Sequence, residues 1–298
     1  MATPHFLRLS DQTADTTRRM LATARRLRDT APETPRPLAG QHVAMLFEKP
    51  SLRTRVSYEV GIRQLGGEAV VLGRHEVGLG ERESVEDVAR VLGGMVQAVA
   101  ARVFRHTDLE RLAACAGVPV INMLSDRFHP SQALADAMTL QDEFGEDLSR
   151  RRLAFIGDGN NVAVSLATVC HQLGMSFVLA CPPGYEPPAE DLPGSGSLQV
   201  VHDPYEAAAG ADALYCDTFT SMGQEAEKDQ RLRDFAPFRV GVELLEAAGP
   251  GAILLHCLPA YRGVEVTDAA LDGPQSRVFP QAWNRLHAQK GMLAELLG

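Results

Sequence analysis

The sequence lacks the even number of cysteines and the paired C-x-x-C spacing that are typical of a disulfide framework or a metal cluster. Its 298 residues include five cysteines, an odd number, and none stands in a C-x-x-C arrangement. We therefore expect no disulfide framework and no metal site, and by default a reducing cytoplasm. An excess of positive charge is also missing. The net charge of −9 argues against nucleic acid or an anionic membrane as a partner.

A long uninterrupted apolar run is absent as well. Residues 159–185 carry no charged side chain, but amides, a histidine, a glycine and two prolines interrupt them. A buried helix followed by a buried strand explains this segment better than a membrane span. The first residues lack the apolar core of a signal peptide, and Asp11 and Asp15 argue against a transit peptide. We expect an amphipathic helix at about 11–28 instead.

Short apolar runs alternate with helical patterns along the chain, which is typical of βαβ units and parallel sheets. A first set of strands is expected at 42–47, 69–73, 98–103 and 118–123, with helices at 53–65, 84–97, 107–116 and 131–144. A polar hinge at 145–152 leads to strands at 153–157, 176–181, 198–201, 213–217 and 252–257, a helix at 162–173, a loop at 182–197 and a last helix at 280–297.

We predict an α/β fold with two doubly wound parallel-sheet domains, 1–144 and 145–279. The C-terminal helix, 280–298, is expected to pack back onto the first domain, so that the first and last helices bridge the domains. Ligands of such sheets bind beyond the carboxyl ends of the strands. We therefore expect the active site in the cleft between the two domains.

Two arginines stand at a predicted helix start, where positive charge is disfavoured. The apolar run 43–47 predicts a strand, Pro50 ends it, and Ser51 caps the helix that follows. The helix dipole makes a positive charge at a helix start unfavourable, by about 0.3 kcal/mol for each of Arg53 and Arg55. Free N–H groups, two hydroxyls and two guanidinium groups at one point favour a small anion. A plain basic helix start is the alternative.

Two further segments suit an anion or a carbonyl oxygen. Arg102 ends a predicted strand, although a lone arginine there is more often a surface residue. His129 opens the run His129-Pro130-Ser131-Gln132 before a predicted helix. A histidine in that position can donate to a carbonyl oxygen or an anion. A capping or packing role is the alternative for a single histidine.

A glycine-rich turn at 157–161 could be mistaken for a dinucleotide-binding turn. The third glycine of G-x-G-x-x-G is missing, because Val162 stands there, and residues 180–182 offer no acidic ribose ligand. This pattern disfavours a nicotinamide dehydrogenase. The amides of Asn160 and Asn161 at the strand mouth suit a substrate with a carboxylate or an ammonium group.

Two later loops place a carboxylate and a cysteine after predicted strands. Asp217 follows one strand, where a carboxylate can hold an ammonium group. His256 and Cys257 end another strand. Neighbouring side chains on a strand point to opposite faces, so we expect no Cys–His nucleophilic pair. Simple burial is the alternative for Cys257, as for most free cysteines.

Taken together, these segments resemble the aspartate/ornithine carbamoyltransferase family. The resemblance rests on residues 47–55 (FEKPSLRTR), 129–132 (HPSQ), 217 with 221–223 (D and SMG) and 256–260 (HCLPA), and it runs to 284–287. The first two motifs mark carbamoyl phosphate binding in the family, and the last two mark its ornithine branch. The resemblance implies transfer of a carbamoyl group from carbamoyl phosphate to the δ-amine of L-ornithine, giving citrulline and phosphate for arginine biosynthesis. It implies no cofactor.

The resemblance also implies a role for each matching residue. Catalytic roles fall to Thr54, Arg102, His129 and Cys257. The residues expected to bind carbamoyl phosphate are Ser51, Leu52, Arg53, Thr54, Gly78, Arg102, His129, Pro130, Ser131, Gln132, Cys257, Leu258 and Arg285. Those expected to bind ornithine are Asn161, Asp217, Ser221 and Met222.

The sequence departs from the family pattern at three places. Leu52 replaces a threonine or another small residue, which matters little because that position acts through its backbone. Gly78 replaces a glutamine or histidine in the loop 77–83, which reaches a neighbouring subunit in the family's trimer, and Arg82 is the residue that can compensate. Trp283 stands where a smaller or acidic residue is usual. From the resemblance alone we expect a homotrimer or an assembly of trimers.

Other functions call for other residues. Aspartate carbamoylation would require a cationic residue in place of Asp217 or Cys257. A carbamoyltransferase for putrescine or an acetylated ornithine would not need Asp217, whose expected partner is a free α-ammonium group. A catalytically silent anion-binding homologue is disfavoured by the joint presence of Arg53, Thr54, Arg102, His129 and Arg285.

Overall fold

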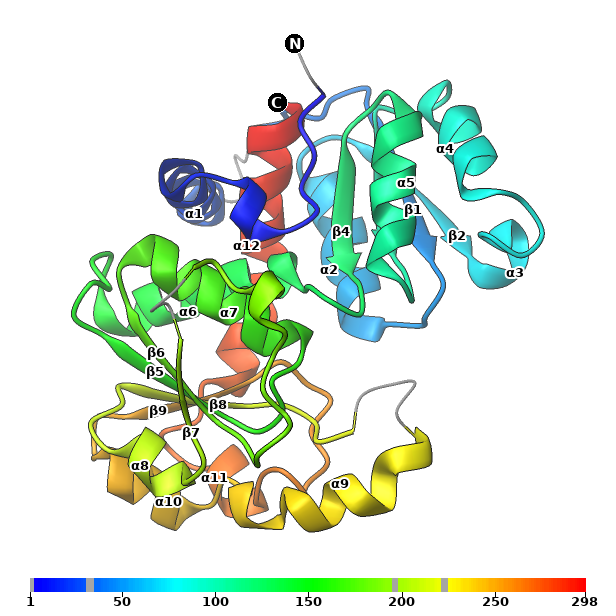
Figure 1. Cartoon of the computed structure of the whole chain (residues 1–298). Helices are drawn as coiled ribbons and strands as arrows, with labels where there is room; N and C mark the ends of the chain where they lie inside the picture. The colour runs from blue at the N-terminus through cyan, green and yellow to red at the C-terminus, as the bar shows by residue number, and fades with distance from the viewer. Residues whose placement is uncertain (1–2, 31–34, 195–197, 221–224) are drawn as a thin grey trace. The chain divides into compact units, whose positions relative to one another are not determined.

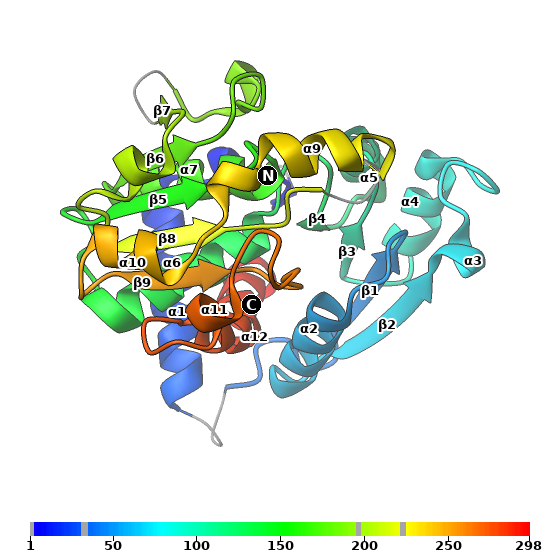
Figure 2. The ribbon, with the colours of Figure 1, turned by 90° about the horizontal axis from the view of Figure 1, so that it is seen from below.

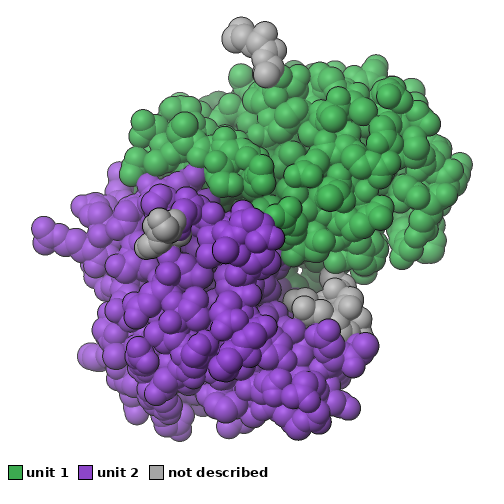
Figure 3. Space-filling view, in the orientation of Figure 1, with its two compact units in different colours: residues 1–135, 284–298 green, residues 136–283 purple. Residues whose placement is uncertain are grey.

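A computed structural model describes residues 3–30, 35–194, 198–220 and 225–298. The chain forms two compact units, which Figure 3 colours separately. Unit 1 comprises Met1–Ala135 with Asn284–Gly298, and unit 2 comprises Asp136–Trp283.

Two helices contain the points at which the chain passes from one unit to the other. Helix α6 (Pro130–Phe144) contains the first point and helix α12 (Val278–Leu297) contains the second. From the sequence we placed the first boundary after residue 144, and we named the first helix as a bridge. That first helix, α1 (Ala14–Asp29), lies wholly within unit 1. A boundary inside a helix has no loop residues that could mark it.

Unit 1 is built on a four-stranded parallel sheet in the order β2-β1-β3-β4, and Figure 1 shows the label of β1 between those of β2 and β4. Strands β1 and β3 are apolar and buried over nearly all their length. Their register sets Phe47 opposite Arg102. Residues 51–55, which we call the anion turn, follow β1, so this turn and Arg102 lie at the carboxyl ends of two neighbouring strands. The elements are β1 (His42–Phe47), β2 (Glu68–Gly73), β3 (Ala98–Arg102), β4 (Val120–Leu124), η1 (Leu9–Asp11), α2 (Leu52–Gln64), α3 (Arg74–Val77), α4 (Val85–Gly93) and α5 (His106–Ala116).

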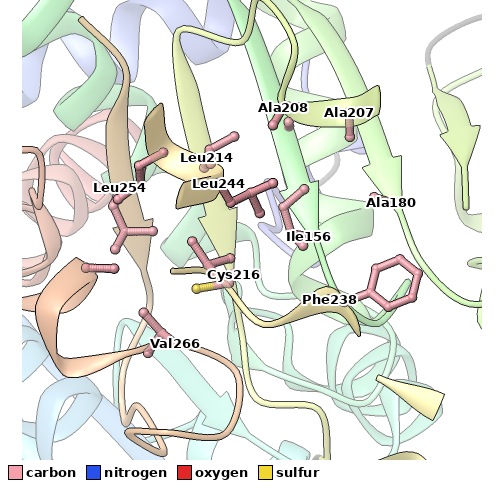
Figure 4. Close-up of a cluster of buried hydrophobic side chains, with 14 of the residues drawn as sticks. Ile156, Ala180, Ala207, Ala208, Leu214, Cys216, Phe238, Leu244, Leu254 and Val266 are labelled. Atoms are coloured by element: carbon pink, nitrogen blue, oxygen red, sulfur yellow. The ribbon is translucent and has the colours of Figure 1, made fainter. Parts of the chain in front are cut away.

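Unit 2 is built on a five-stranded sheet in the order β7-β6-β5-β8-β9, and Figure 2 shows β5, β6 and β8 running in one direction. Its core joins Ile156, Leu214 and Leu254 on three strands to Leu244 on a covering helix (Figure 4). Burial of each such side chain stabilises the unit by about 1.5–3 kcal/mol. The elements are β5 (Arg152–Ile156), β6 (Ser176–Ala180), β7 (Gln199–Val201), β8 (Ala213–Cys216), β9 (Ile253–His256), α7 (Asn161–Leu173), α8 (Pro204–Ala208), α9 (Lys228–Asp234), α10 (Val242–Ala248), α11 (Asp268–Leu271), η2 (Ala189–Asp191), η3 (Glu225–Glu227) and η4 (Ala236–Phe238).

The strands expected from the sequence are all present, each with bounds within two residues of the expected ones. Five short helices, α3 and α8 to α11, were not predicted, because none is longer than seven residues. So short a segment shows no measurable helical period. Within the described ranges, none of the helices combines the length and the apolar character needed to span a bilayer.

Candidate active site

Helix α2 begins at the predicted anion turn. Ser51 is its N-cap, and the Ser51 Oγ accepts from the N–H of Thr54 at 3.3 Å. The other N–H groups of a first helical turn have no partner within the helix and can bind an anion. The Leu52 side chain is 75% exposed, so this residue offers the turn only its backbone. Arg55 pairs with Glu59 at 3.5 Å along the helix, which separates it from the turn.

Three residues from distant parts of the sequence meet behind this turn. From helix α12, the Arg285 Nη2 donates to the Oγ1 of Thr54 at 2.7 Å, and the Arg285 Nη1 donates to the Oε1 of Gln132. All three side chains are buried in unit 1. Since Thr54 accepts from Arg285, its own O–H remains able to donate to a ligand. The predicted residues Thr54, Gln132 and Arg285 therefore form one connected group.

His129 and Arg102 are buried in the same unit. Burial lowers the pKa of His129 well below 6.5, and the positive charges of Arg285 and Arg102 lower it further. The imidazole is therefore neutral near pH 7. A neutral imidazole can donate one hydrogen bond to an oxygen that gains negative charge. The charges of Arg285 and Arg102 near His129 also favour an anionic ligand beside it.

The start of α6 is fixed by the hydroxyl of Ser131. The Ser131 Oγ donates to the carbonyl oxygen of Asn122 at 3.1 Å and lies 2.6 Å from the hydroxyl of Tyr58. Because Ser131 donates to Asn122, the Tyr58 hydroxyl is the donor to Ser131. Any contribution of Ser131 to a ligand is then through its backbone. The Ser131 side chain holds His129, Pro130 and Gln132 against β4 and α2.

The loop after α3 takes a conformation that needs glycine at position 78. Gly78 has a φ of +60°, and a Cβ there would lie 2.7 Å from the Cβ of Arg82. The Arg82 Nη1 donates to the carbonyl oxygen of Glu76 at 3.3 Å, so its guanidinium group contacts its own loop. A larger residue at 78 would change this conformation. The structure gives no account of Trp283, which is 67% exposed.

In unit 2 a carboxylate is held at the ends of three neighbouring strands. The Asp217 Oδ2 accepts from the Nδ2 of Asn160 at 2.8 Å, and its Oδ1 accepts from the thiol of Cys257 at 3.1 Å. Asn160 is the N-cap of α7, and its Oδ1 accepts from the N–H groups of Val162 and Ala163. The family resemblance assigns Asn161 to ornithine binding, which stays a prediction, and the amide that contacts Asp217 is that of the neighbouring Asn160. The residues Ser221 and Met222 lie outside the described part of the chain.

His256 supports the loop that carries Cys257 and Leu258. The His256 Nδ1 accepts from the N–H of Leu258 at 2.8 Å, so its proton is on Nε2, which lies 3.1 Å from the Oε1 of Glu265. Glu265 Oε1 also accepts from the N–H of Tyr261 at 2.6 Å. Leu258 has a φ of +57°, a conformation that costs a non-glycine residue about 1–2 kcal/mol. His256 and Glu265 hold this loop, and the thiol of Cys257 donates to Asp217.

The turn before Asn160 is anchored by a residue that the sequence did not point to. Arg231, on α9, pairs with Asp158 and donates through its Nε to the carbonyl oxygen of Phe219 at 2.6 Å. Burial raises the pKa of Asp158 to about 6, although the charge of Arg231 opposes the shift. Both side chains are buried. The pair joins the turn at 157–160 to α9, which follows the Asp217 loop.

Asp217, His256 and Cys257 have the side-chain types of a metal site, but both ring nitrogens of the histidine are already hydrogen-bonded. Ligand atoms of Asp217, His256 and Cys257 lie within 4.8 Å of one another. Both nitrogens of His256 are already engaged, by Leu258 and by Glu265. A metal ion here would have to break the hydrogen bonds that hold the loop. The arrangement instead suits an ammonium group on Asp217.

The fold and the two sites define a two-domain α/β protein that offers an anion site in one unit and a carboxylate for a cationic ligand in the other. Two family models match the chain. The carbamoyl-P binding domain of aspartate/ornithine carbamoyltransferase matches residues 4–142, and the Asp/Orn binding domain of the same family matches residues 149–296. The chain therefore belongs to the aspartate/ornithine carbamoyltransferase family.

Individual relatives agree with the family models. The chain is 54% identical to the ornithine carbamoyltransferase of Thermus thermophilus over 87% of this chain and 86% of the relative. It is 45% identical to that of Staphylothermus marinus, over 98% and 97%. The solved ornithine carbamoyltransferase from Pyrococcus furiosus matches with a TM-score of 0.95 at 44% identity, covering 100% of this chain and 98% of the other.

Proposed function

We propose that this protein is an enzyme that transfers the carbamoyl group of carbamoyl phosphate to the δ-amine of L-ornithine, giving citrulline and phosphate. The observation that carries the proposal is the meeting of Thr54, Gln132 and Arg285 behind the anion turn. High similarity to ornithine carbamoyltransferases over the whole chain supports it. The biological role would then be arginine biosynthesis.

The phosphate group of carbamoyl phosphate is assigned to the start of α2. The N–H groups of Leu52 and Arg53, the hydroxyls of Ser51 and Thr54, and the Arg53 guanidinium group are the donors. Arg285 adds a cation that Thr54 and Gln132 hold in place. Charge-assisted hydrogen bonds of this kind are about twice as strong as neutral ones. As the carbamoyl group leaves, the phosphate gains charge that these donors stabilise.

The carbamoyl group is assigned to Arg102, His129, Gln132 and Thr54. When the amine attacks, negative charge develops on the carbonyl oxygen, and fixed donors aimed at it lower the barrier by about 3–4 kcal/mol each. His129 stays neutral, because burial and the nearby arginines lower its pKa. As a neutral imidazole it can donate one N–H hydrogen bond to that oxygen. The reaction proceeds by direct attack through a tetrahedral intermediate.

The amino-acid end of ornithine is assigned to Asp217, with Asn161, Ser221 and Met222. Asp217 accepts from Asn160 and Cys257, which aim its carboxylate at an ammonium group. The δ-amine must be neutral to attack, and an alkylamine of this kind has a pKa near about 10.4 in water. Cys257 and the carbonyl oxygen of Leu258 are assigned to the space near that amine. A partly apolar surrounding there favours the neutral form.

We propose that the protein acts as a homotrimer, or an assembly of trimers, in the cytoplasm. Helix α2 presents an apolar stripe of Leu52, Val56 and Val60, which are 75%, 51% and 38% exposed. Such a stripe fits a contact with a second copy of the chain. The five free cysteines fit a reducing compartment. Light scattering after gel filtration should give three times 32.2 kDa or a multiple of that mass.

A panel of amines tests the substrate. Purified protein is supplied with carbamoyl phosphate and, in turn, L-ornithine, L-aspartate, putrescine and an acetylated ornithine. Citrulline and phosphate should form in equal amounts from ornithine, with at least about 100-fold lower turnover of the others. Putrescine and the acetylated ornithine lack the free α-ammonium group assigned to Asp217, and L-aspartate lacks a δ-amine. Turnover of putrescine or acetylated ornithine without turnover of ornithine would overturn the assignment. Binding of carbamoyl phosphate without any turnover would favour a silent homologue.

A further inference from the structure

A second group of metal-ligand side chains lies at the carboxyl ends of two neighbouring strands of unit 2. Cys181 follows β6, His202 follows β7, and Glu186 lies in the loop that leaves β6. The Cys181 thiol sulfur, a ring nitrogen of His202 and a carboxylate oxygen of Glu186 lie within 4.8 Å of one another. Sulfur, imidazole and carboxylate together are a typical ligand set for Zn²⁺.

The ring of His202 is oriented by a hydrogen bond that suits a metal ligand. Its Nδ1 lies 2.8 Å from the carbonyl oxygen of Cys181. A carbonyl oxygen can only accept, so the proton is on Nδ1 and the lone pair of the neutral ring is on Nε2. Metal-binding histidines nearly always donate their other N–H to a carbonyl or carboxylate, which fixes the ring in this way. The backbone of one ligand residue therefore orients the side chain of another.

Glu186 is oriented by the same kind of contact. Its Oε2 accepts from the N–H of Gly184 at 2.9 Å, and its Oε1 lies 3.9 Å from the Nε2 of His202. That distance is too long for a hydrogen bond. It is close to the separation of about 3.3 Å between two ligands of one tetrahedral Zn²⁺ ion. Only a small side-chain adjustment would bring both atoms onto a common ion.

Zn²⁺ binds a cysteine as its thiolate. Binding of the ion would therefore displace the thiol proton of Cys181, and the ion would balance the negative charge left on the sulfur.

We propose that Cys181, Glu186 and His202 form a Zn²⁺ site, with water as the fourth ligand. The site is separate from Asp217 and from the residues assigned to the reaction. It joins the ends of β6 and β7, and β7 is an edge strand of three residues, Gln199–Val201. Binding of the ion would therefore stabilise this edge of the sheet. Because the ligands are 5 and 16 residues apart and include only one cysteine, their spacing matches no zinc motif in the sequence.

Zinc titration of the full-length protein tests the site. The protein is treated with a chelator, desalted and titrated with ZnSO₄ by calorimetry in two buffers of different ionisation enthalpy. We expect one ion per chain with a Kd below about 1 µM and release of about one proton at pH 7, from Cys181. X-ray absorption at the zinc edge should show one sulfur at about 2.3 Å and nitrogen or oxygen at about 2.0–2.1 Å. Saturating zinc should raise the Tm.

Matched cysteine variants locate the ion. Cys181→Ser and His202→Gln should each weaken binding at least 10-fold, while Cys115→Ser and Cys257→Ser should leave it within about 2-fold. His202 is half exposed, so its replacement preserves a testable fold if Cys181→Ser does not. Loss of binding in Cys257→Ser instead would move the ion to Asp217 and overturn the proposal. Binding weaker than about 100 µM, or a zinc spectrum without sulfur, would also overturn it.

Discussion

Replacement of Thr54 with valine isolates a single hydrogen-bonding group in the proposed phosphate site. Valine has nearly the shape of threonine, and the side chain is 1% exposed, so packing is preserved. The change removes the Oγ1 that accepts from Arg285 at 2.7 Å. It also removes the O–H assigned to carbamoyl phosphate. Thr54→Ser keeps both hydrogen-bonding functions and is the matched control.

The expected loss follows from the kind of hydrogen bond that is broken. A hydrogen bond to a charged group contributes about 1.5–3 kcal/mol. Each 1.36 kcal/mol corresponds to about a tenfold change in rate, so kcat/KM for carbamoyl phosphate should fall roughly 10- to 150-fold. The KM for ornithine should stay within about 3-fold, because Thr54 belongs to unit 1 and Asp217 to unit 2.

Citrulline formation measured over a range of carbamoyl phosphate concentrations, at saturating ornithine, gives these values. Thr54→Ser should retain kcat/KM within about 5-fold of the wild type. If Thr54→Val stayed within 2-fold of the wild type, or if the serine variant lost as much as the valine variant, the assignment of this hydroxyl would be wrong.

Three further changes test other parts of the site. Asp217→Asn should raise the KM for ornithine by about 10- to 100-fold through loss of one charged contact, and an equal rise in the KM for carbamoyl phosphate would refute this role. His256→Leu should lower the free energy of unfolding by about 1–3 kcal/mol in urea, because it removes the acceptor of the Leu258 N–H. His256→Leu should also lower kcat. His256→Asn, whose side chain can still accept from the Leu258 N–H, should recover part of the unfolding free energy and part of kcat. No recovery of either would contradict the positioning role of His256. The folded-state pKa of His129 lies below 6.5, so the unfolded chain binds that proton first and stability is lost as the pH falls below 6.5. His129→Asn should therefore lose less unfolding free energy than the wild type between pH 6.5 and 5. The carboxyl of Asp158, with its pKa of about 6, makes stability change with pH in the opposite direction, but it does so equally in the wild type and in His129→Asn. Equal pH dependence of the unfolding free energy in the two proteins would therefore contradict the prediction.

The strands could be predicted because their physical signal is local. Each is a short apolar run between turn residues, and a strand buried on both faces of a parallel sheet has that pattern. The unit boundaries could not be located in the same way, because they fall inside α6 and α12. Helical periodicity is continuous across them, and only tertiary packing divides each helix.

From the residues alone, the candidate site could be predicted only where a motif places its residues side by side in the sequence, and Arg285, remote from Thr54 and Gln132, was assigned through the family resemblance. The anion turn at Ser51 is such a case, since its cap and its arginines are neighbours. The contact between Asn160 and Asp217 is not, because 57 positions separate the two residues. Two asparagines are adjacent here, and only the structure shows that Asn160 is the one that caps α7 and contacts Asp217. Arg231 gave no signal at all, because its partner Asp158 is 73 positions away and their pairing depends on the fold.

A crystal structure with a bisubstrate analogue, in which a phosphonate is joined to ornithine, tests the central claim most directly. We predict density for the phosphonate among the N–H groups of Leu52 and Arg53, with Thr54 and Arg285 in contact with it. The α-ammonium group of the same molecule should lie on the carboxylate of Asp217. An analogue bound with its phosphonate away from the start of α2, or with its ammonium group away from Asp217, would contradict the proposed reaction.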